Sequence, residues 1–197
     1  MALKSLLKTT LALLASLLLI SSAQAHWSLD NALSQLSFVT VKADHVAEVH
    51  TFDVISGTIG DGGEVEITIE LASVNTMIPI RNERMQAMLF ETNLFPQATV
   101  TGTVDIDGLA ALPAGSSQTI QVEFELSLHG SSNALMADLM VTRSQDGLVA
   151  STMKPVIVTA ESAGLVAGVE QLREVAGLPS ISRAVPVSFT VVFEQGH

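Results

Sequence analysis

Apolar and polar residues alternate along four stretches of the chain. In residues 64–71 every odd position is apolar and every even position is polar, and the same period of two recurs in 100–107, 120–128 and 185–193. Successive side chains of a β-strand point to opposite faces of the sheet, so each stretch predicts a strand with one dry and one wet face. Such strands are typical of antiparallel sheets.

Less regular segments rich in strand-forming residues complete this pattern. They cover residues 36–42, 52–59, 135–143 and 148–159. Glycine-containing turns such as 61–63 separate neighbouring segments and favour hairpins, because glycine adopts positive φ at little cost. At least eight strands joined mostly by short turns predict an all-β fold, either a closed antiparallel barrel or a sandwich.

Two short helices are expected between the strands. Asn82 is placed to cap the first helix, which would run through Phe90, and Ser162 is placed to cap the second. In the second helix apolar residues recur at helical spacing from Leu165 to Ala176, and a glycine and a proline follow. The sequence contains no internal repeat and no linker, which favours a single domain.

The first 25 residues have the composition of a secretory signal. Two lysines precede an apolar run over 11–20, and the small residues of 21–25 follow. This order predicts export and cleavage after Ala25, which leaves residues 26–197 as the mature domain. An uncleaved membrane anchor is the alternative, but the apolar run is shorter than the roughly 20 residues that a spanning helix needs.

The mature domain is strongly acidic. The signal holds two of the nine basic residues, so seven remain against 20 acidic ones, a formal charge of −13. This charge argues against nucleic acid and against a polybasic membrane clamp, and no later apolar run is long enough for stable membrane insertion. The chain has no cysteine, which excludes a thiol nucleophile and disulfide support. We therefore expect a soluble protein of the periplasm, stabilised by core burial and sheet closure.

The histidines form no recognisable metal or catalytic site. His45 and His50 lie near Asp44 and Glu48, but their spacing matches no helical histidine pair, and strand residues five apart point to opposite faces. His129 follows a strand without the Gly-x-Ser-x-Gly turn of serine hydrolases, so we expect it to be a solvated loop residue. No bound metal is predicted.

Two further patterns have structural explanations. The glycine-rich segment 57–63 lies between two strands rather than before a helix, so it is interpreted as a hairpin and not as a phosphate-binding loop. Paired carboxylates, such as Glu64 with Glu66 and Glu123 with Glu125, lie on the wet faces of their strands, where they are unsuited to acid–base catalysis. We expect neither enzymatic activity nor a cofactor.

The apolar interior is the remaining functional feature. A small eight-stranded barrel either fills with side chains or holds one ligand, and the composition does not separate the two. The residues expected to line a cavity are apolar and lie mainly on the dry faces of the strands. They are Phe38, Phe52, Val65, Ile67, Ile69, Val104, Phe124, Leu126, Phe189 and Val191.

Short motifs along residues 26–197 resemble those of the YceI-like family, exported lipid-binding proteins with a lipocalin-like barrel. In chain order they are Trp27-Ser28-Leu29-Asp30, Ser34-Gln35-Leu36-Ser37-Phe38, Phe52…Ser56-Gly57-Thr58-Ile59, Ser73-Val74-Asn75-Thr76, Arg81-Asn82 and Leu89-Phe90…Phe95-Pro96. The resemblance implies a closed antiparallel barrel of about eight strands. It also implies a polyisoprenoid ligand, such as an isoprenoid quinone or a prenyl diphosphate, in an elongated cavity.

Two positions depart from the family pattern. The family's histidine before Ser34 is Leu33 here, and its aspartate after Arg81 is Asn82. If that histidine holds a polar head group, this chain binds a different head group or none. Arg81 and Arg84 are the head-group candidates, because a diphosphate needs a cation. The alternative is that both arginines form ion pairs at the surface or between strand and helix.

These observations lead to one functional expectation and one alternative. We expect an exported binder or carrier of an isoprenoid lipid or quinone, and a homodimer is a further open possibility. The alternative is a periplasmic, stress-related structural or interaction module whose barrel is packed and holds no ligand.

Overall fold

A computed structural model describes residues 27–196, which form one sheet of twelve strands. The predicted signal over 1–25 lies outside the described residues. The strands are β1 (Trp27–Leu29), β2 (Gln35–Lys42), β3 (Val46–Phe52), β4 (Ile55–Ile59), β5 (Glu64–Glu70), β6 (Val74–Asn75), β7 (Gln97–Thr103), β8 (Ser117–Leu128), β9 (Ser131–Arg143), β10 (Gly147–Thr152), β11 (Val156–Thr159) and β12 (Ala184–Gln195). The helical segments are the 3-10 turn η1 (Leu71–Ser73), α1 (Pro79–Arg84), the π-helical turn η2 (Met85–Leu89), α2 (Ile106–Ala110) and α3 (Val166–Val175).

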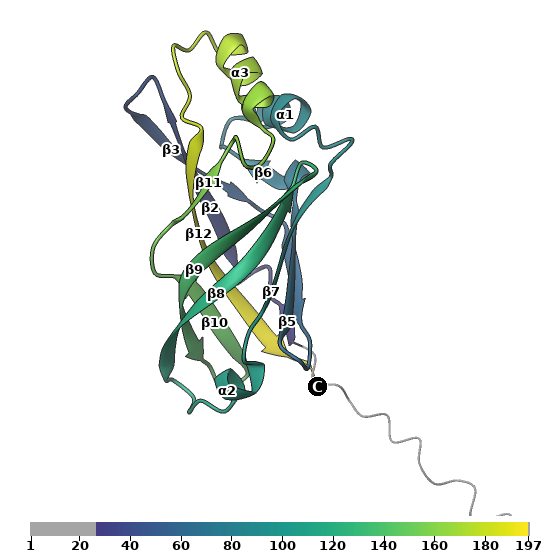
Figure 1. Ribbon diagram of the computed structural model, residues 1–197, viewed down its shortest axis with the longest axis vertical. Helices are drawn as coiled ribbons and strands as arrows, with labels where there is room; N and C mark the ends of the chain where they lie inside the picture. The colour runs from purple at the N-terminus through teal and green to yellow at the C-terminus, as the bar shows by residue number, and fades with distance from the viewer. Residues whose placement is uncertain (1–26, 197) are drawn as a thin grey trace, which may run out of the picture.

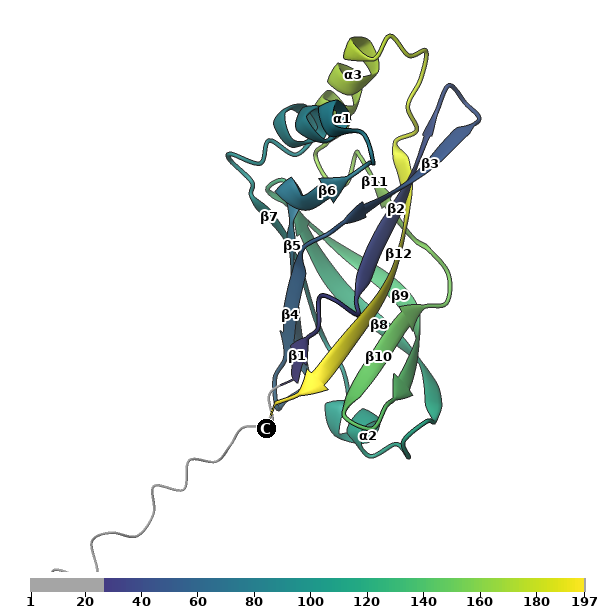
Figure 2. The same ribbon diagram turned by 180° about the vertical axis from the view of Figure 1, so that it is seen from behind.

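The twelve strands form eight antiparallel paths around a barrel (Figures 1 and 2). Four paths are broken into two strands each: β1 with β2, β3 with β4, β5 with β6, and β10 with β11. Each path pairs with the next one along the chain. The last strand, β12, pairs with both β1 and β2, and this pairing closes the ring. The predicted closed antiparallel barrel of about eight strands is therefore confirmed.

The alternating pattern of the sequence separates the inside of the barrel from its outside. In β8, for example, Glu123 and Glu125 are exposed, whereas Phe124 packs against the core and Leu126 is buried. Burial of such side chains stabilises the sheet by about 25 cal/mol for each Å² of apolar surface removed from water. The inner faces of all eight paths contribute to one continuous apolar interior.

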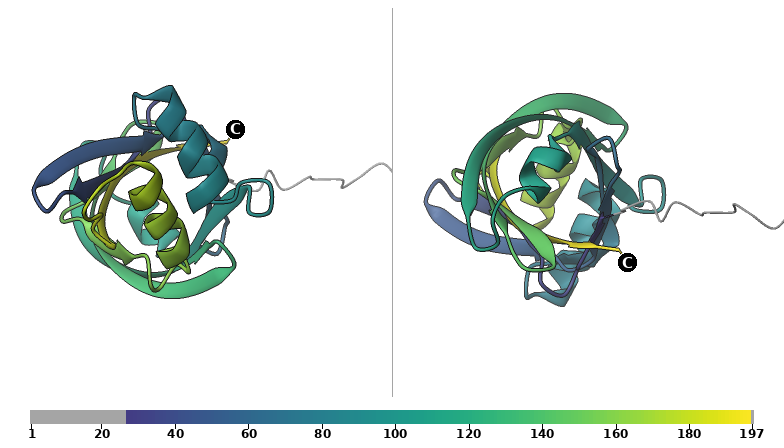
Figure 3. Two further views of the ribbon diagram at one scale, coloured as in Figure 1. Left: turned by 90° about the horizontal axis from the view of Figure 1, so that it is seen from above. Right: turned by 90° about the horizontal axis from the view of Figure 1, so that it is seen from below.

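The two ends of the barrel are covered differently (Figure 3). At one end α2 lies across the opening and buries Ile106 and Leu109. The guanidinium of Arg143 donates to the Ala110 carbonyl oxygen there and lies 5.6 Å from the centre of the Trp27 ring. At the other end α1, η2 and α3 lie over the barrel, so that the helices form a cover at this end (Figure 1).

A glycine allows the helices of this cover to approach closely. A Cβ atom on Gly168 of α3 would lie 2.6 Å from the Met88 carbonyl oxygen and 2.8 Å from the Leu89 Cα atom. Both distances are shorter than a van der Waals contact, so only glycine permits this packing of α3 on η2. Leu89 and Val169 are buried beside it.

The helices differ in detail from those expected. Strand β7 ends at Thr103, and the Asp105 side chain accepts a hydrogen bond from the Gly108 backbone N–H, which begins the unpredicted helix α2. Asn82 does not cap the first helix, which begins at Pro79. Its side chain instead accepts hydrogen bonds from the backbone N–H and the hydroxyl of Thr76.

The second expected helix also begins at a residue other than the one predicted. Helix α3 starts after Leu165, and Ser162 lies in the preceding turn without capping it. Within residues 27–196, no helix combines the length and apolar character needed to cross a membrane.

Candidate functional site: an apolar cavity with a polar end

A cavity of about 480 Å³ runs through the barrel interior. This volume lies in the usual range of small-molecule sites, roughly 300–1,000 Å³. Its wall is built from the inward-facing side chains of the strands and from the helices at the covered end. All ten apolar residues that the sequence suggested lie in this wall: Phe38, Phe52, Val65, Ile67, Ile69, Val104, Phe124, Leu126, Phe189 and Val191.

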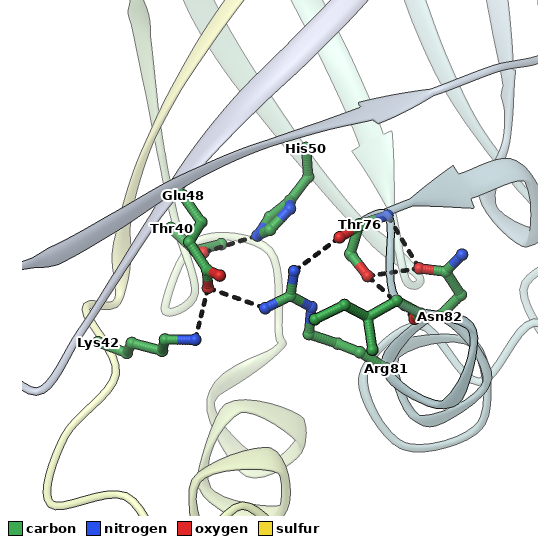
Figure 4. Close-up of polar contacts among 8 residues, drawn as sticks. Thr40, Lys42, Glu48, His50, Thr76, Arg81 and Asn82 are labelled. Carbon is green, nitrogen blue, oxygen red and sulfur yellow. Dashed lines mark hydrogen bonds and ion pairs between the residues drawn. The ribbon is translucent and has the colours of Figure 1, made fainter.

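The inner faces of β2 and β3 become polar toward the helical end. In β2 the inward positions after Phe38 are Thr40 and Lys42, and in β3 the inward positions before Phe52 are Glu48 and His50. The strand register places Thr40 opposite Glu48 and Phe38 opposite His50, so the polar side chains gather at one end of the cavity (Figure 4).

Glu48 holds two cations at this polar end. Its Oε2 atom lies 2.6 Å from Lys42 Nζ and 2.8 Å from Arg81 Nη1 (Figure 4). Arg81 also donates from Nη2 to the Thr76 carbonyl oxygen at 2.7 Å. The hydrogen bond from Lys42, helped by the charge of Arg81, holds the pKa of the Glu48 carboxyl below its usual value. For Arg81, the expected alternative of an ion pair between strand and helix is therefore present.

His50 is buried at this polar end, with 3% of its surface exposed. One ring nitrogen, Nε2, lies 2.9 Å from the Thr40 hydroxyl, and the ring packs edge-on against Phe38 at 5.3 Å. Burial lowers the pKa of His50, and the charge of Arg81 lowers it further. Among the described residues, His50 Nδ1 and Arg81 Nε are buried without a hydrogen-bond partner. Unpartnered buried polar atoms are uncommon, so these two are available to a bound polar group.

Arg84 contributes a second arginine to the same end. It lies in the last turn of α1, lines the cavity and forms no ion pair within residues 27–196. Leu33, which replaces the family's histidine, is 62% exposed on the turn before β2 and does not line the cavity. This position therefore adds no polar group to the interior of this chain.

The cavity opens at its polar end. The exposed members of its wall come from the start of α1 and the end of α3, namely Ile78, Ile80, Val175 and Ala176. Lys42 of β2 also lines this opening and is partly exposed. At the opposite end the wall residues Leu109 and Phe193 are buried.

The other candidate residues lie apart from the cavity. His45 is exposed in the turn between β2 and β3, away from the buried ring of His50. His129 is not a freely solvated loop residue as expected: Nε2 lies 2.8 Å from Glu91 Oε2, and the ring packs 4.4 Å from Phe95. No three potential metal-ligating side chains gather anywhere in the described part of the chain.

Comparison with known proteins connects this architecture to one family. Residues 27–193 match the model of the YceI-like domain. A polyisoprenoid binding domain from Saccharophagus degradans, implicated in plant cell wall breakdown, is 40% identical with a TM-score of 0.85, and the alignment covers 88% of this chain and 99% of that one. Comparison with curated proteins returns no similar sequence.

Two more distant structures share the fold. BcnA from Burkholderia cenocepacia is 16% identical with a TM-score of 0.62, and 83% of this chain and 98% of that chain are aligned. The YCEI protein of Campylobacter jejuni is 16% identical with a TM-score of 0.53, and the coverage is 75% and 84%. Since the family model spans nearly all described residues, the chain belongs to the YceI-like domain family.

Proposed function

We propose that this protein is an exported binder or carrier of an isoprenoid lipid, whose tail occupies the barrel cavity. The observation that carries the proposal is the continuous apolar cavity of about 480 Å³. A packed structural barrel would leave no such space, because well-packed interiors contain few voids larger than a water molecule. The name of the 40% identical relative, a polyisoprenoid binding domain, supports the same ligand class. Export to the periplasm is part of the proposal and follows from the composition of residues 1–25.

The polar end of the cavity is proposed to hold the head group. Lys42, Arg81 and Arg84 bring three positive charges there, and Glu48 offsets one of them. The unpartnered Arg81 Nε donates to an acceptor oxygen of the head group, and His50 Nδ1 offers a second contact. A diphosphate or a quinone carbonyl supplies such acceptors.

The tail contributes most of the affinity. Each CH₂ group moved from water into the cavity contributes about 0.8 kcal/mol, so a fully buried tail of some 40 carbons would contribute roughly 30 kcal/mol. Because measured affinities rarely exceed about 20 kcal/mol, the ordering of a long tail must offset part of this gain. Head-group contacts are then a smaller, selective addition.

A cavity-filling variant tests the proposal. Ala137 lies on the inner face of β9 and is buried in the cavity wall, whereas Ala134 is exposed on the outer face of the same strand. We expect Ala137→Phe to lower the amount of isoprenoid that co-purifies from the native host, measured by mass spectrometry of extracted lipids. Ala134→Phe, with the same change in size, should retain the wild-type amount.

Thermal unfolding of both variants shows whether the barrel remains intact. If Ala137→Phe unfolds, Ala150→Phe on the inner face of β10 gives a second test of the same space. The proposal fails if wild-type protein carries no lipid and, once delipidated, binds neither a prenyl diphosphate nor a quinone. It also fails if folded Ala137→Phe and Ala134→Phe carry equal loads.

A further inference from the structure

Apolar side chains surround the opening of the cavity. Ile78, Ile80 and Val175 line the opening and are exposed to solvent. Met77 precedes the first two and is 85% exposed, and Val46 is exposed at the tip of the β2–β3 hairpin, opposite Lys42 in the strand register. We call these five residues the mouth rim. They come from three separate segments that meet at the same end of the molecule (Figures 1 and 2).

Local contacts hold Met77 in the solvent. Its φ of 62° lies in the left-handed region, which costs a residue with a side chain about 1–3 kcal/mol. The Met77 backbone N–H donates to Asn75 Oδ1 at 2.9 Å, and the neighbouring Thr76 is buried and bound to Asn82. The hydrogen bonds of the loop therefore keep the Met77 side chain exposed. The backbone strain at Met77 is not offset by burial of its apolar side chain.

The charge of the molecule is distributed unevenly around this end. The segments that surround the opening are 42–48, 79–89 and 160–183, and they hold five of the seven basic residues and six of the 20 acidic residues of the mature domain. Their formal charge is −1, so the rest of the domain carries −12. The far end has carboxylates on its turns and on α2, including Asp61, Asp105, Asp107 and Asp146.

We propose that the mouth rim docks on the surface of a phospholipid membrane. This inference rests on the proposed function, because a lipid tail that passes through water exposes apolar surface at about 0.8 kcal/mol for each CH₂. Contact between the rim and the bilayer lets the tail pass between them without that cost. Apolar side chains of peripheral proteins enter the headgroup region by about 5–10 Å, a depth that exposed rim residues reach.

The acidic body does not oppose this orientation. Strand β8 has 12 residues and spans roughly 40 Å at about 3.3 Å for each residue. Charges at the far end therefore lie several Debye lengths from a membrane at the mouth, since this length is about 8 Å at physiological ionic strength. The negative charge of the domain repels anionic lipid at the body and at the far end, and it leaves the nearly neutral mouth end as the favoured face.

Vesicle binding of two matched double variants tests the proposal. Met77 and Val46 belong to the rim but do not line the cavity, and Met136 and Val54 are a methionine and a valine with 55% and 47% exposure that belong neither to the rim nor to the cavity wall. We expect Met77→Ser with Val46→Ser to lower binding of the chain from His26 onward by about tenfold. The probe is vesicles of phosphatidylethanolamine with a minor share of phosphatidylglycerol, measured by co-flotation. Met136→Ser with Val54→Ser should bind like the wild type.

A second measurement separates docking from ligand binding. Loading with an isoprenoid quinone from detergent solution should be the same in both double variants and the wild type, whereas transfer from vesicles should slow only in the rim variant. The proposal is overturned if the wild type does not bind vesicles, or if both double variants lose binding equally. It is also overturned if the rim variant converts a wild-type dimer into a monomer in light scattering, because the rim would then contact a second copy.

Discussion

Glu48 shows how the apolar interior tolerates charge at one point. Its carboxylate accepts from Lys42 and Arg81, so two cations share one anion and one positive charge remains beside the cavity. All three side chains are partly exposed, so this ion-pair group adds little to stability. Its larger effect is on orientation, because Glu48 and the Thr76 carbonyl hold the Arg81 guanidinium with Nε unpartnered beside the cavity.

His50 should make the stability of the protein depend on pH just below its ordinary pKa of 6.5. Burial lowers its pKa in the folded state below the ordinary value of 6.5, so the unfolded chain binds a proton more readily. Stability is then fully present above pH 6.5 and is lost as the pH falls through the lower folded pKa. We expect the melting temperature of the wild type to decrease over this interval and that of His50→Gln to decrease less.

An exposed histidine provides the control for this prediction. His45→Gln removes a ring from the turn before β3, where the residue is exposed, and it should keep the wild-type slope. Glu48 does not contribute in this interval, because its pKa lies below its ordinary value of 4.5. A wild-type slope in His50→Gln would show that other groups carry the pH dependence.

Sequence patterns predicted the apolar wall of the cavity better than its polar end. Alternation assigns apolar positions such as Ile67 to the dry face, and the structure places them there. The same rule assigns polar residues to the wet face, so Thr40 and Glu48 gave no sign that they point inward. Their spacing from the apolar wall residues could have found them, because strand residues two apart point to the same face. Thr40 is two residues after Phe38, and Glu48 and His50 are four and two residues before Phe52.

At the scale of elements, local alternation and tertiary position compete near Val104. Val100, Val104 and Ile106 continue the period of two, so the sequence predicted an uninterrupted strand. The structure ends β7 at Thr103, and Asp105 caps the short helix α2. At this end of the barrel the chain forms α2 across the opening, so Ile106 is buried as part of a helix instead of a strand. Short apolar segments of this kind are ambiguous without knowledge of what they pack on.

The contact between α3 and η2 should hold the helical cover in place over the cavity. Gly168→Val places a branched side chain where even Cβ would lie 2.6 Å from the Met88 carbonyl oxygen. We expect a loss of about 1–3 kcal/mol in the free energy of unfolding, because the helix must move away from η2. Release of bound isoprenoid to acceptor vesicles should become faster as the cover loosens.

A valine at the neighbouring position is the control for this helix. Ala167 is exposed on α3, so Ala167→Val places the same branched side chain on the helix without entering the contact. Chemical denaturation and the release rate measure both effects. Equal losses in the two variants would attribute the effect to a branched side chain anywhere on α3 rather than to the α3–η2 contact.

The whole molecule is a barrel that α2 closes at one end, and its cavity opens at the other end among the covering helices α1, η2 and α3. Sheet closure removes free strand edges, which matters in a chain that has no cysteine to form disulfides. Arg143, Trp27 and α2 occupy the far end, and the cavity opens between α1 and α3. A linear ligand that enters tail first would therefore place its tail in the apolar barrel and its head among Lys42, Arg81 and His50.

Tail length should determine affinity more than the head group does. Each added isoprene unit contributes apolar surface along the cavity wall, at about 0.8 kcal/mol for each buried CH₂, until the cavity is filled. The head group gains one or two hydrogen bonds to charged donors, worth about 1.5–3 kcal/mol each. We expect the Kd of delipidated protein to fall steeply along a series of quinones with longer tails. It should change less between a quinone and a diphosphate of equal tail length.

Removal of the arginines separates the two contributions. Arg81→Ala with Arg84→Ala should weaken a prenyl diphosphate by about tenfold or more, and a quinone of equal tail length less, because only the diphosphate carries charge. Arg173→Ala with Arg183→Ala removes two cations from the same end but outside the cavity wall, so it should change neither Kd. Equal weakening of both ligands by the first pair would show that the arginines support the fold of the opening and do not read the head group. Equal weakening by both pairs would assign the effect to the overall charge of this end.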